Sequence, residues 1–170
     1  MGRSELNVVI GLGNEYRRDD AVGLYVARKV SELGPAGVRV VEGVGHGASL
    51  LEVWDGMETA FVVDAVVASG SAGRIYRFRP LVARLPVSIF TALSTHGLNV
   101  AKAIELGKEL GRIPRSMVVY GIEGADFSAG IGLTPEVARA AGEVVDSIGC
   151  ELARVSKGAR AKSDAMTARD

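Results

Sequence analysis

Three side chains able to bind a metal ion occur where the chain is expected to leave a strand or to enter a helix. Asp20 follows an expected strand at 7–11, Asp64 closes another at 59–63, and His96 stands in the first turn of an expected helix. Because ligands gather at the carboxyl ends of parallel strands, we expect the three side chains to meet at that edge of a sheet. Two carboxylates and one imidazole suit a divalent first-row metal better than calcium and leave coordination positions open. Such a metal could polarise a peptide carbonyl or activate a bound water.

Each of these residues also has an ordinary structural interpretation. An aspartate such as Asp20 in the first turn of a helix is commonly a favourable charge near the helix dipole. Asp64 could form a turn, and a lone histidine such as His96 after Ser-Thr is more often a capping or surface residue than a ligand. The metal interpretation gains weight because the sequence holds no HExxH helix, Walker loop, GxSxG elbow or cysteine cluster.

The apolar pattern predicts alternating strands and helices that would position these residues. Short apolar runs predict buried strands, an alternating run predicts an antiparallel edge strand, and stripes at helical spacing predict helices. The expected strands are 7–11, 38–41, 59–63, 74–78 and 116–120. The first expected helix covers 19–33. Three further helices are expected to begin within 49–54, at Ser94 or Thr95, and at Thr134 and Pro135. This order predicts an α/β fold, a three-layer α/β/α sandwich with a mostly parallel, mixed sheet of about five strands.

The length of 170 residues fits one domain. We expect a single α/β domain at 1–156 and a mobile C-terminal tail at 157–170, where the apolar periodicity is lost. The start of the chain has too short an apolar run for a signal peptide, and the stretch AFVVDAVVASG is too short for a membrane helix. No membrane partner is therefore expected.

The charge and cysteine content narrow the class of protein further. Lys plus Arg and Asp plus Glu number 20 each, so no net field attracts nucleic acid, and we expect no nucleic-acid partner. Cys150 is the only cysteine, which excludes an internal disulfide and a four-cysteine zinc site. A reducing cytoplasm suits that count.

Five motifs in order resemble one known family. They are GLGNEYRRDDAVG, VVDAV, STHG, GIEG and GLTPEV, spread over about the first 150 residues. Together they resemble the hydrogenase maturation endopeptidases, which remove the C-terminal extension of nickel-iron hydrogenase large subunits. Joined in this order the motifs are far more specific than any one of them.

The resemblance implies an activity, a metal and a partner. It implies a metal-dependent endopeptidase in which Asp20, Asp64 and His96 bind the metal. The metal would be nickel, supplied by the hydrogenase large-subunit precursor, although another divalent metal would fit the same ligands. Cleavage would then report that nickel loading is complete. A one-to-one complex with a large precursor suits a monomer.

Some residues depart from the family pattern or admit other roles. Ala21 and Gly124 stand where the family more often has glycine and proline. His46, in a glycine-rich loop, could be an extra ligand, but we expect no ligand role for it. We expect Glu123 to accept backbone N–H groups of the long loop that follows it, and Asn14 to brace the loop after the first strand.

Two other functions stay open at this point. One is a non-catalytic, nickel-dependent checkpoint or chaperone, which would bind the precursor without cutting it. The other is peptidyl-tRNA hydrolase, because GLGN also opens that family. The histidine that hydrolase chemistry needs is replaced here by the Asp19–Asp20 pair, and the net charge does not favour tRNA. A dinucleotide fingerprint is excluded because its third glycine would fall at Tyr16.

Overall fold

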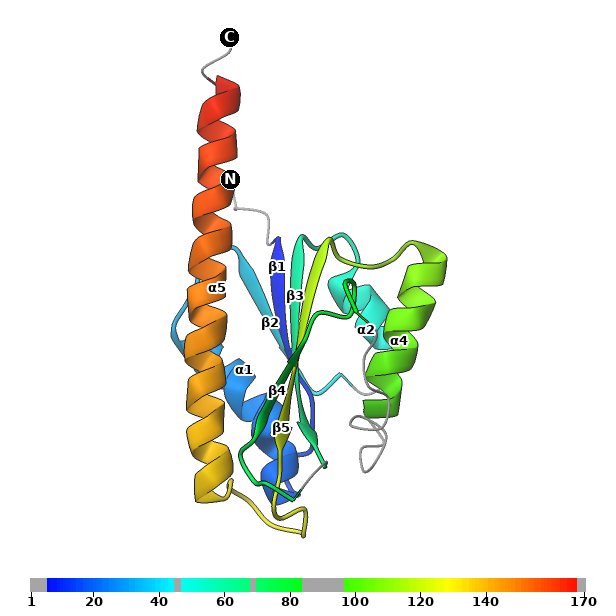
Figure 1. The fold of residues 1–170 in the computed structure, drawn as a ribbon, viewed down its shortest axis with the longest axis vertical. Helices are drawn as coiled ribbons and strands as arrows, with labels where there is room; N and C mark the ends of the chain where they lie inside the picture. The colour runs from blue at the N-terminus through cyan, green and yellow to red at the C-terminus, as the bar shows by residue number, and fades with distance from the viewer. Residues whose placement is uncertain (1–5, 45–46, 68–69, 84–96, 168–170) are drawn as a thin grey trace.

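The structure contains one mixed sheet with helices on both of its faces (Figure 1). It is a computed structural model and describes residues 6–44, 47–67, 70–83 and 97–167. The strands are β1 (Asn7–Gly11), β2 (Val38–Glu42), β3 (Thr59–Val66), β4 (Ile75–Phe78) and β5 (Ser116–Glu123). They lie in the order β2-β1-β3-β5-β4, all parallel except β4, which pairs antiparallel with β5. The predicted fold, including its antiparallel edge strand, is confirmed.

Two apolar layers separate the sheet from its helices. The helices α1 (Val22–Glu32) and α5 (Pro135–Thr167) cover one face, and α2 (Gly47–Trp54) and α4 (Gly97–Leu110) cover the other (Figure 1). Alternate residues of a strand point to opposite faces. In β3 the residues facing α1 and α5 are Phe61, Val63 and Ala65, and those facing α2 and α4 are Ala60, Val62 and Val66. We call these the α1/α5 face and the α2/α4 face.

The two central strands are longer than the sequence predicts. β3 ends at Val66 and β5 at Glu123, whereas the expected strands end at 63 and 120. Asp64 and Glu123 therefore lie within strands rather than after them. Both strands are buried over these extra residues, and a continuous buried run gives no periodicity from which its end can be located.

The first helix begins later than predicted. Residues Arg18–Ala21 form a separate 3-10 turn, η1, and α1 starts only at Val22. Asp19 and Asp20 thus lie in η1 and not in the first turn of an α-helix. The reason is tertiary, because the side chain of Asp19 bonds a distant loop, as described below.

The last helix is longer than predicted. α5 continues to Thr167, past the domain end expected at 156. Leu152 is the last buried residue among those of α5 whose burial is described, and the following sequence is rich in Ala, Lys and Arg, which are strong helix formers. Residues 157–167 therefore extend a helix, and the mobility of the tail stays a prediction. None of the helices in the described part of the chain is long and apolar enough to cross a membrane.

Candidate active site at the carboxyl edge of the sheet

Asp64 lies near the carboxyl end of the central strand β3. It is fully buried and pairs with Gly121 of β5. Because it shares the alternation of Val62 and Val66, its side chain faces the α2/α4 face. The Ala65 N–H donates to its Oδ1 at 2.9 Å. The structure thus places this carboxylate at the edge of the sheet where the sequence predicts the site.

Asp20 lies on η1, which packs against β3. Only 4% of the residue is exposed, and its N–H donates to the Arg17 carbonyl at 3.0 Å. Gly13, with φ of 132°, lies so close to the Asp20 carbonyl that a Cβ at position 13 would overlap it. The loop after β1 is therefore held against the backbone of Asp20, and only glycine fits at this contact.

A second glycine brings the two aspartates to the same edge. A Cβ at Gly23 would overlap the carbonyl oxygens of Leu12 and Val63, so the start of α1 touches the backbone just after β1 and in the carboxyl half of β3. The Leu12 N–H also donates to the Val63 carbonyl at 2.9 Å. Asp20 precedes this contact on η1, and Asp64 follows it on β3. The predicted meeting of these two acids at one edge is consistent with this packing.

The third predicted ligand, His96, lies outside the described residues, as does His46. α4 begins at the next residue, Gly97, and covers the face toward which Asp64 points. It begins at the end of the sheet where β3 and β5 finish (Figure 1). Among the described residues, which leave out His96, no three His, Cys, Asp or Glu side chains form a group that could hold a metal. The three-ligand site stays a prediction.

Asp19 has a role that the sequence did not reveal. Its carboxylate is fully buried and accepts bonds from the N–H groups of Ala125 and Asp126, at 2.9 and 3.0 Å. It also accepts from Thr134, through the N–H at 2.7 Å and the hydroxyl at 2.9 Å. Asp19 thus attaches the loop 124–134 and the start of α5 to η1. A separation of more than 100 residues hides such a contact from any local pattern.

The backbone reinforces the contact between η1 and the loop 124–134. The Arg18 N–H donates to the Gly130 carbonyl at 3.1 Å, and the Gly130 N–H donates to the Tyr16 carbonyl at 2.9 Å. Arg18 has a φ of 44°, unusual for a residue with a side chain, and its guanidinium lies 3.3 Å from Asp126. The pKa of Asp126 is lowered by hydrogen bonds from Ser128. This loop forms a fixed wall beside Asp20.

Asn14 and Glu123 both hold loops, as the sequence predicts, although Glu123 holds a different loop from the one expected. Asn14 Oδ1 accepts from the Tyr16 N–H at 2.9 Å and so braces the loop after β1. Glu123 accepts backbone N–H groups as expected, but from Gly70 and Ser71, in the connection between β3 and β4, and also from the Tyr76 hydroxyl at 3.0 Å. The loop that follows Glu123 is held by Asp19 instead.

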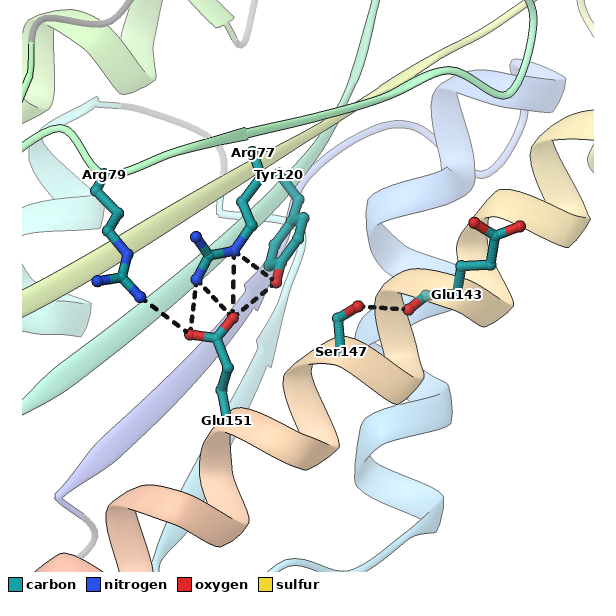
Figure 2. Close-up of polar contacts among 6 residues, drawn as sticks. All are labelled: Arg77, Arg79, Tyr120, Glu143, Ser147 and Glu151. Atoms are coloured by element: carbon teal, nitrogen blue, oxygen red, sulfur yellow. Dashed lines mark hydrogen bonds and ion pairs between the residues drawn. The ribbon is translucent and has the colours of Figure 1, made fainter.

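A polar cluster on the opposite face joins β4 and β5 to α5 (Figure 2). Arg77 donates to both carboxylate oxygens of Glu151, at 2.8 and 2.9 Å, and the Tyr120 hydroxyl donates to the same carboxylate at 2.9 Å. Arg79 reaches that carboxylate at 4.0 Å. Burial raises the pKa of Tyr120, which keeps its hydroxyl protonated as a donor. The cluster fixes the edge strand against α5.

The fold and the site together define a class of protein. A three-layer α/β/α domain carries four buried acids at or beside the carboxyl edge of its sheet. The family model for hydrogenase maturation protease (HycI) matches residues 24–150, which is more than half of the chain. The chain belongs to the hydrogenase maturation protease family. The matched span contains Asp64 and His96 and begins just after Asp20.

Solved structures from the same family share the fold. The hydrogenase maturating endopeptidase HybD from E. coli has a TM-score of 0.75 and 22% identity, over 88% of this chain and 93% of that one. The nickel-iron hydrogenase maturation protease HybD from Thermococcus kodakarensis has a TM-score of 0.69 and 23% identity, over 86% of this chain and 98% of that one. None of the curated proteins compared with the chain matches it. At these identities the structures establish the fold alone.

Proposed function

We propose that this protein is an endopeptidase that removes the C-terminal extension of a nickel-loaded large-subunit precursor of a nickel-iron hydrogenase. Family membership over residues 24–150 supports the protease activity and the class of substrate. The observation that carries the site is the packing of η1 against β3, which puts Asp20 and Asp64 at one edge of the sheet. We also propose that the protein is a monomer and that it works in the cytoplasm.

The residues present at this edge fit a divalent metal. Two carboxylates, on Asp20 and Asp64, supply oxygen ligands, and His96, directly before α4, would supply a nitrogen. In the proposal the nickel is part of the substrate, since it arrives in the precursor. When bound, it would polarise the scissile carbonyl or lower the pKa of a water.

The protein's own residues bind and orient the precursor. Asp20 and Asp64 would hold the nickel-bearing end of the precursor at a fixed distance from the sheet, and this positioning places the scissile bond in one geometry. The loop 124–134, attached through Asp19, and the loop held by Glu123 would exclude water on either side. Both loops are fixed by buried carboxylates, so little ordering is required when the substrate binds.

The decisive experiment compares precursor with and without nickel. Wild-type protein is incubated with each form, and the mass of the large subunit is measured over time. We expect the nickel-loaded chain alone to lose its extension. Binding without any shortening would favour the checkpoint or chaperone, and release of peptide from peptidyl-tRNA would favour the hydrolase. Equal cleavage of both forms would reject nickel as the recognition element.

Single variants test the three residues. Asp20→Ala, Asp64→Ala and His96→Ala are each expected to abolish cleavage while the circular dichroism spectrum and the unfolding midpoint stay close to those of the wild type. Cleavage that persists in all three variants would reject the assigned site.

A further inference from the structure

The outer side of strand β4 offers backbone groups to a partner. β4 is the last strand of the sheet and pairs only with β5 among the described residues. The Glu123 N–H donates to the Arg74 carbonyl at 2.9 Å, which makes these two residues a hydrogen-bonded pair of the antiparallel ladder. Such pairs alternate along the ladder, so the N–H and C=O groups of Ile75 and Arg77 point away from β5. Within the described residues, no hydrogen bond satisfies these outward groups.

This edge is held in place before any partner arrives. The Tyr76 hydroxyl donates to Glu123 on the α2/α4 face at 3.0 Å. On the α1/α5 face, Arg77 binds Glu151 of α5 through two N–H groups (Figure 2). The Gly73 N–H donates to the Glu123 carbonyl at 2.7 Å, so Gly73 and Arg74 both face Glu123, as in a β-bulge. An added strand would bind a preformed edge, which lowers the entropic cost of binding.

The edge carries an excess of positive charge. Arg74, Arg77 and Arg79 lie within six consecutive residues, and Glu151 is the acid paired with two of them. The Arg79 side chain is 59% exposed, and the Arg74 guanidinium lies 5.3 Å from the centre of the Tyr76 ring. The chain as a whole has a formal net charge of +0, so this charge is local. It would attract an acidic segment.

The same charge argues against pairing with a second copy of the chain. Two β4 edges side by side would bring the arginines of both copies together, and like charges on adjacent strands destabilise the pair. Charged side chains on an edge strand are a common means of preventing such self-association. The arginines therefore select an oppositely charged partner over a copy of this protein.

The edge is close to the candidate active site. Tyr76 pairs with Gly121, and Gly121 pairs with Asp64, so the three residues form one row across the sheet. Neighbouring strands are about 4.8 Å apart, which puts Asp64 about 10 Å from Tyr76 and about 15 Å from a strand added beyond β4. Five residues of extended chain span about 17 Å. One peptide could thus bind the edge and still reach the site.

We propose that the β4 edge binds an extended, acidic segment of the precursor by strand addition, through the outward backbone groups of Ile75 and Arg77 and the charges of Arg74 and Arg79. Main-chain hydrogen bonds supply affinity in this mode of recognition, and side chains supply selectivity. The inference rests on the proposed function for the identity of the partner. It adds a second point of contact, separate from Asp20 and Asp64.

Charge reversal gives the first test. The double variant Arg74→Glu/Arg79→Glu is compared with Arg39→Glu, which makes one such charge reversal on β2 at the opposite edge of the sheet. For cleavage of nickel-loaded precursor we expect KM to rise about tenfold in the double variant, equivalent to about 1.4 kcal/mol, with kcat within about twofold. Arg39→Glu should leave both constants unchanged. Equal KM values in the double variant and the wild type would overturn the proposal.

A backbone variant tests strand addition itself. Ile75→Pro removes an outward N–H group without removing a bond of the β4–β5 ladder, and Ile75→Val keeps that N–H as the matched control. A rise in KM in the proline variant, with a normal kcat and an unfolding midpoint near that of the control, supports the proposal. If the proline variant fails to fold, the charge-reversal pair decides.

A binding measurement separates this inference from the proposed function. The probe is a fluorescent ten-residue peptide alternating glutamate and valine, with a lysine–valine peptide as its counterpart. We expect wild type and Asp64→Asn to bind the acidic peptide equally, more weakly at high salt, and the double charge-reversal variant to bind it at least about tenfold more weakly. Absence of cleavage by wild type would reject the proposed function alone. Equal binding of both peptides would reject the edge site alone.

Discussion

Two pairs of buried acids lie near the same edge of the sheet, and they differ in what they bind. Asp19 and Glu123 accept hydrogen bonds from loops, in the case of Asp19 from residues more than 100 positions away. Asp20 and Asp64 lie beside them, on η1 and β3, and Asp64 accepts from the N–H of its own neighbour Ala65. Acidity and burial alone therefore do not identify the residues of the candidate active site, because two of the four acids, Asp19 and Glu123, hold loops beside it. The two pairs should respond differently to substitution.

The largest expected effect concerns the site pair. Asp64→Asn keeps the size of the side chain and removes its charge. We expect cleavage of nickel-loaded precursor to fall by at least about 10³-fold, with the free energy of unfolding changed by less than about 1 kcal/mol. Asp146→Asn, at an exposed position on α5, is the matched control and should cleave at the wild-type rate. If Asp64→Asn slows cleavage and also strongly lowers the free energy of unfolding, Asp64 belongs with Asp19 and Glu123, the acids that hold loops.

The next largest effect concerns Asp19. Asp19→Ala leaves three N–H donors and a hydroxyl without their buried acceptor, and we expect the free energy of unfolding to fall by about 3 to 4 kcal/mol. Urea unfolding measures this loss. Thr134→Val, which removes only the hydroxyl contact, should lose about 1 kcal/mol. An Asp19→Ala protein with wild-type stability would remove the distinction between the two pairs.

Asp64 and Asp19 also show how much of the structure the sequence could predict. The strand and helix order, the edge strand at 75–78 and the position of Asp64 near the carboxyl end of a strand follow from local apolar patterns. The bonds of Asp19 do not, since they join residues far apart in the chain. The predicted start of the first helix was wrong for the same reason. The residues expected to begin the helix form a 3-10 turn, because Asp19 bonds a distant loop.

Glycine contacts were equally hidden from local reasoning. Gly13 lies in the loop after β1 and has a φ of 132°, a conformation that glycine adopts readily, so a glycine in this loop is expected from local structure. The sequence carries no indication that Gly23 lies against the carbonyls of Leu12 and Val63, because close approach between backbones depends on how the elements pack. The prediction for His96 stays open.

A smaller effect is expected at Glu123. Tyr76→Phe removes one of its donors, and we expect a loss of about 1 kcal/mol in the free energy of unfolding. Glu123→Ala removes the acceptor for two backbone N–H groups as well and should cost about 2 to 3 kcal/mol. Hydrogen exchange of the amides of Gly70 and Ser71 should accelerate in Glu123→Ala. Unchanged exchange there would show that the loop does not depend on this carboxylate.

The smallest effect concerns the cluster on the other face of the sheet. Burial raises the pKa of Tyr120 above its ordinary value of 10.0, so the folded state holds this proton more tightly than the unfolded state. Its contribution to stability is complete below about pH 10 and is lost as pH rises through the higher folded pKa. Tyr120→Phe should cost about 1 kcal/mol at neutral pH and reduce the alkaline decline in stability. An identical alkaline decline in both proteins would contradict this assignment.

The length of α5 has a practical consequence for all of these measurements. The helix starts at Pro135, next to the wall of the site, and its 33 residues span about 50 Å. Its far end lies beyond the opposite end of the sheet (Figure 1). A tag or fluorophore attached at the Thr167 end of α5 would lie far from the candidate active site, so the protein could be immobilised on a solid support without obstructing access of the precursor.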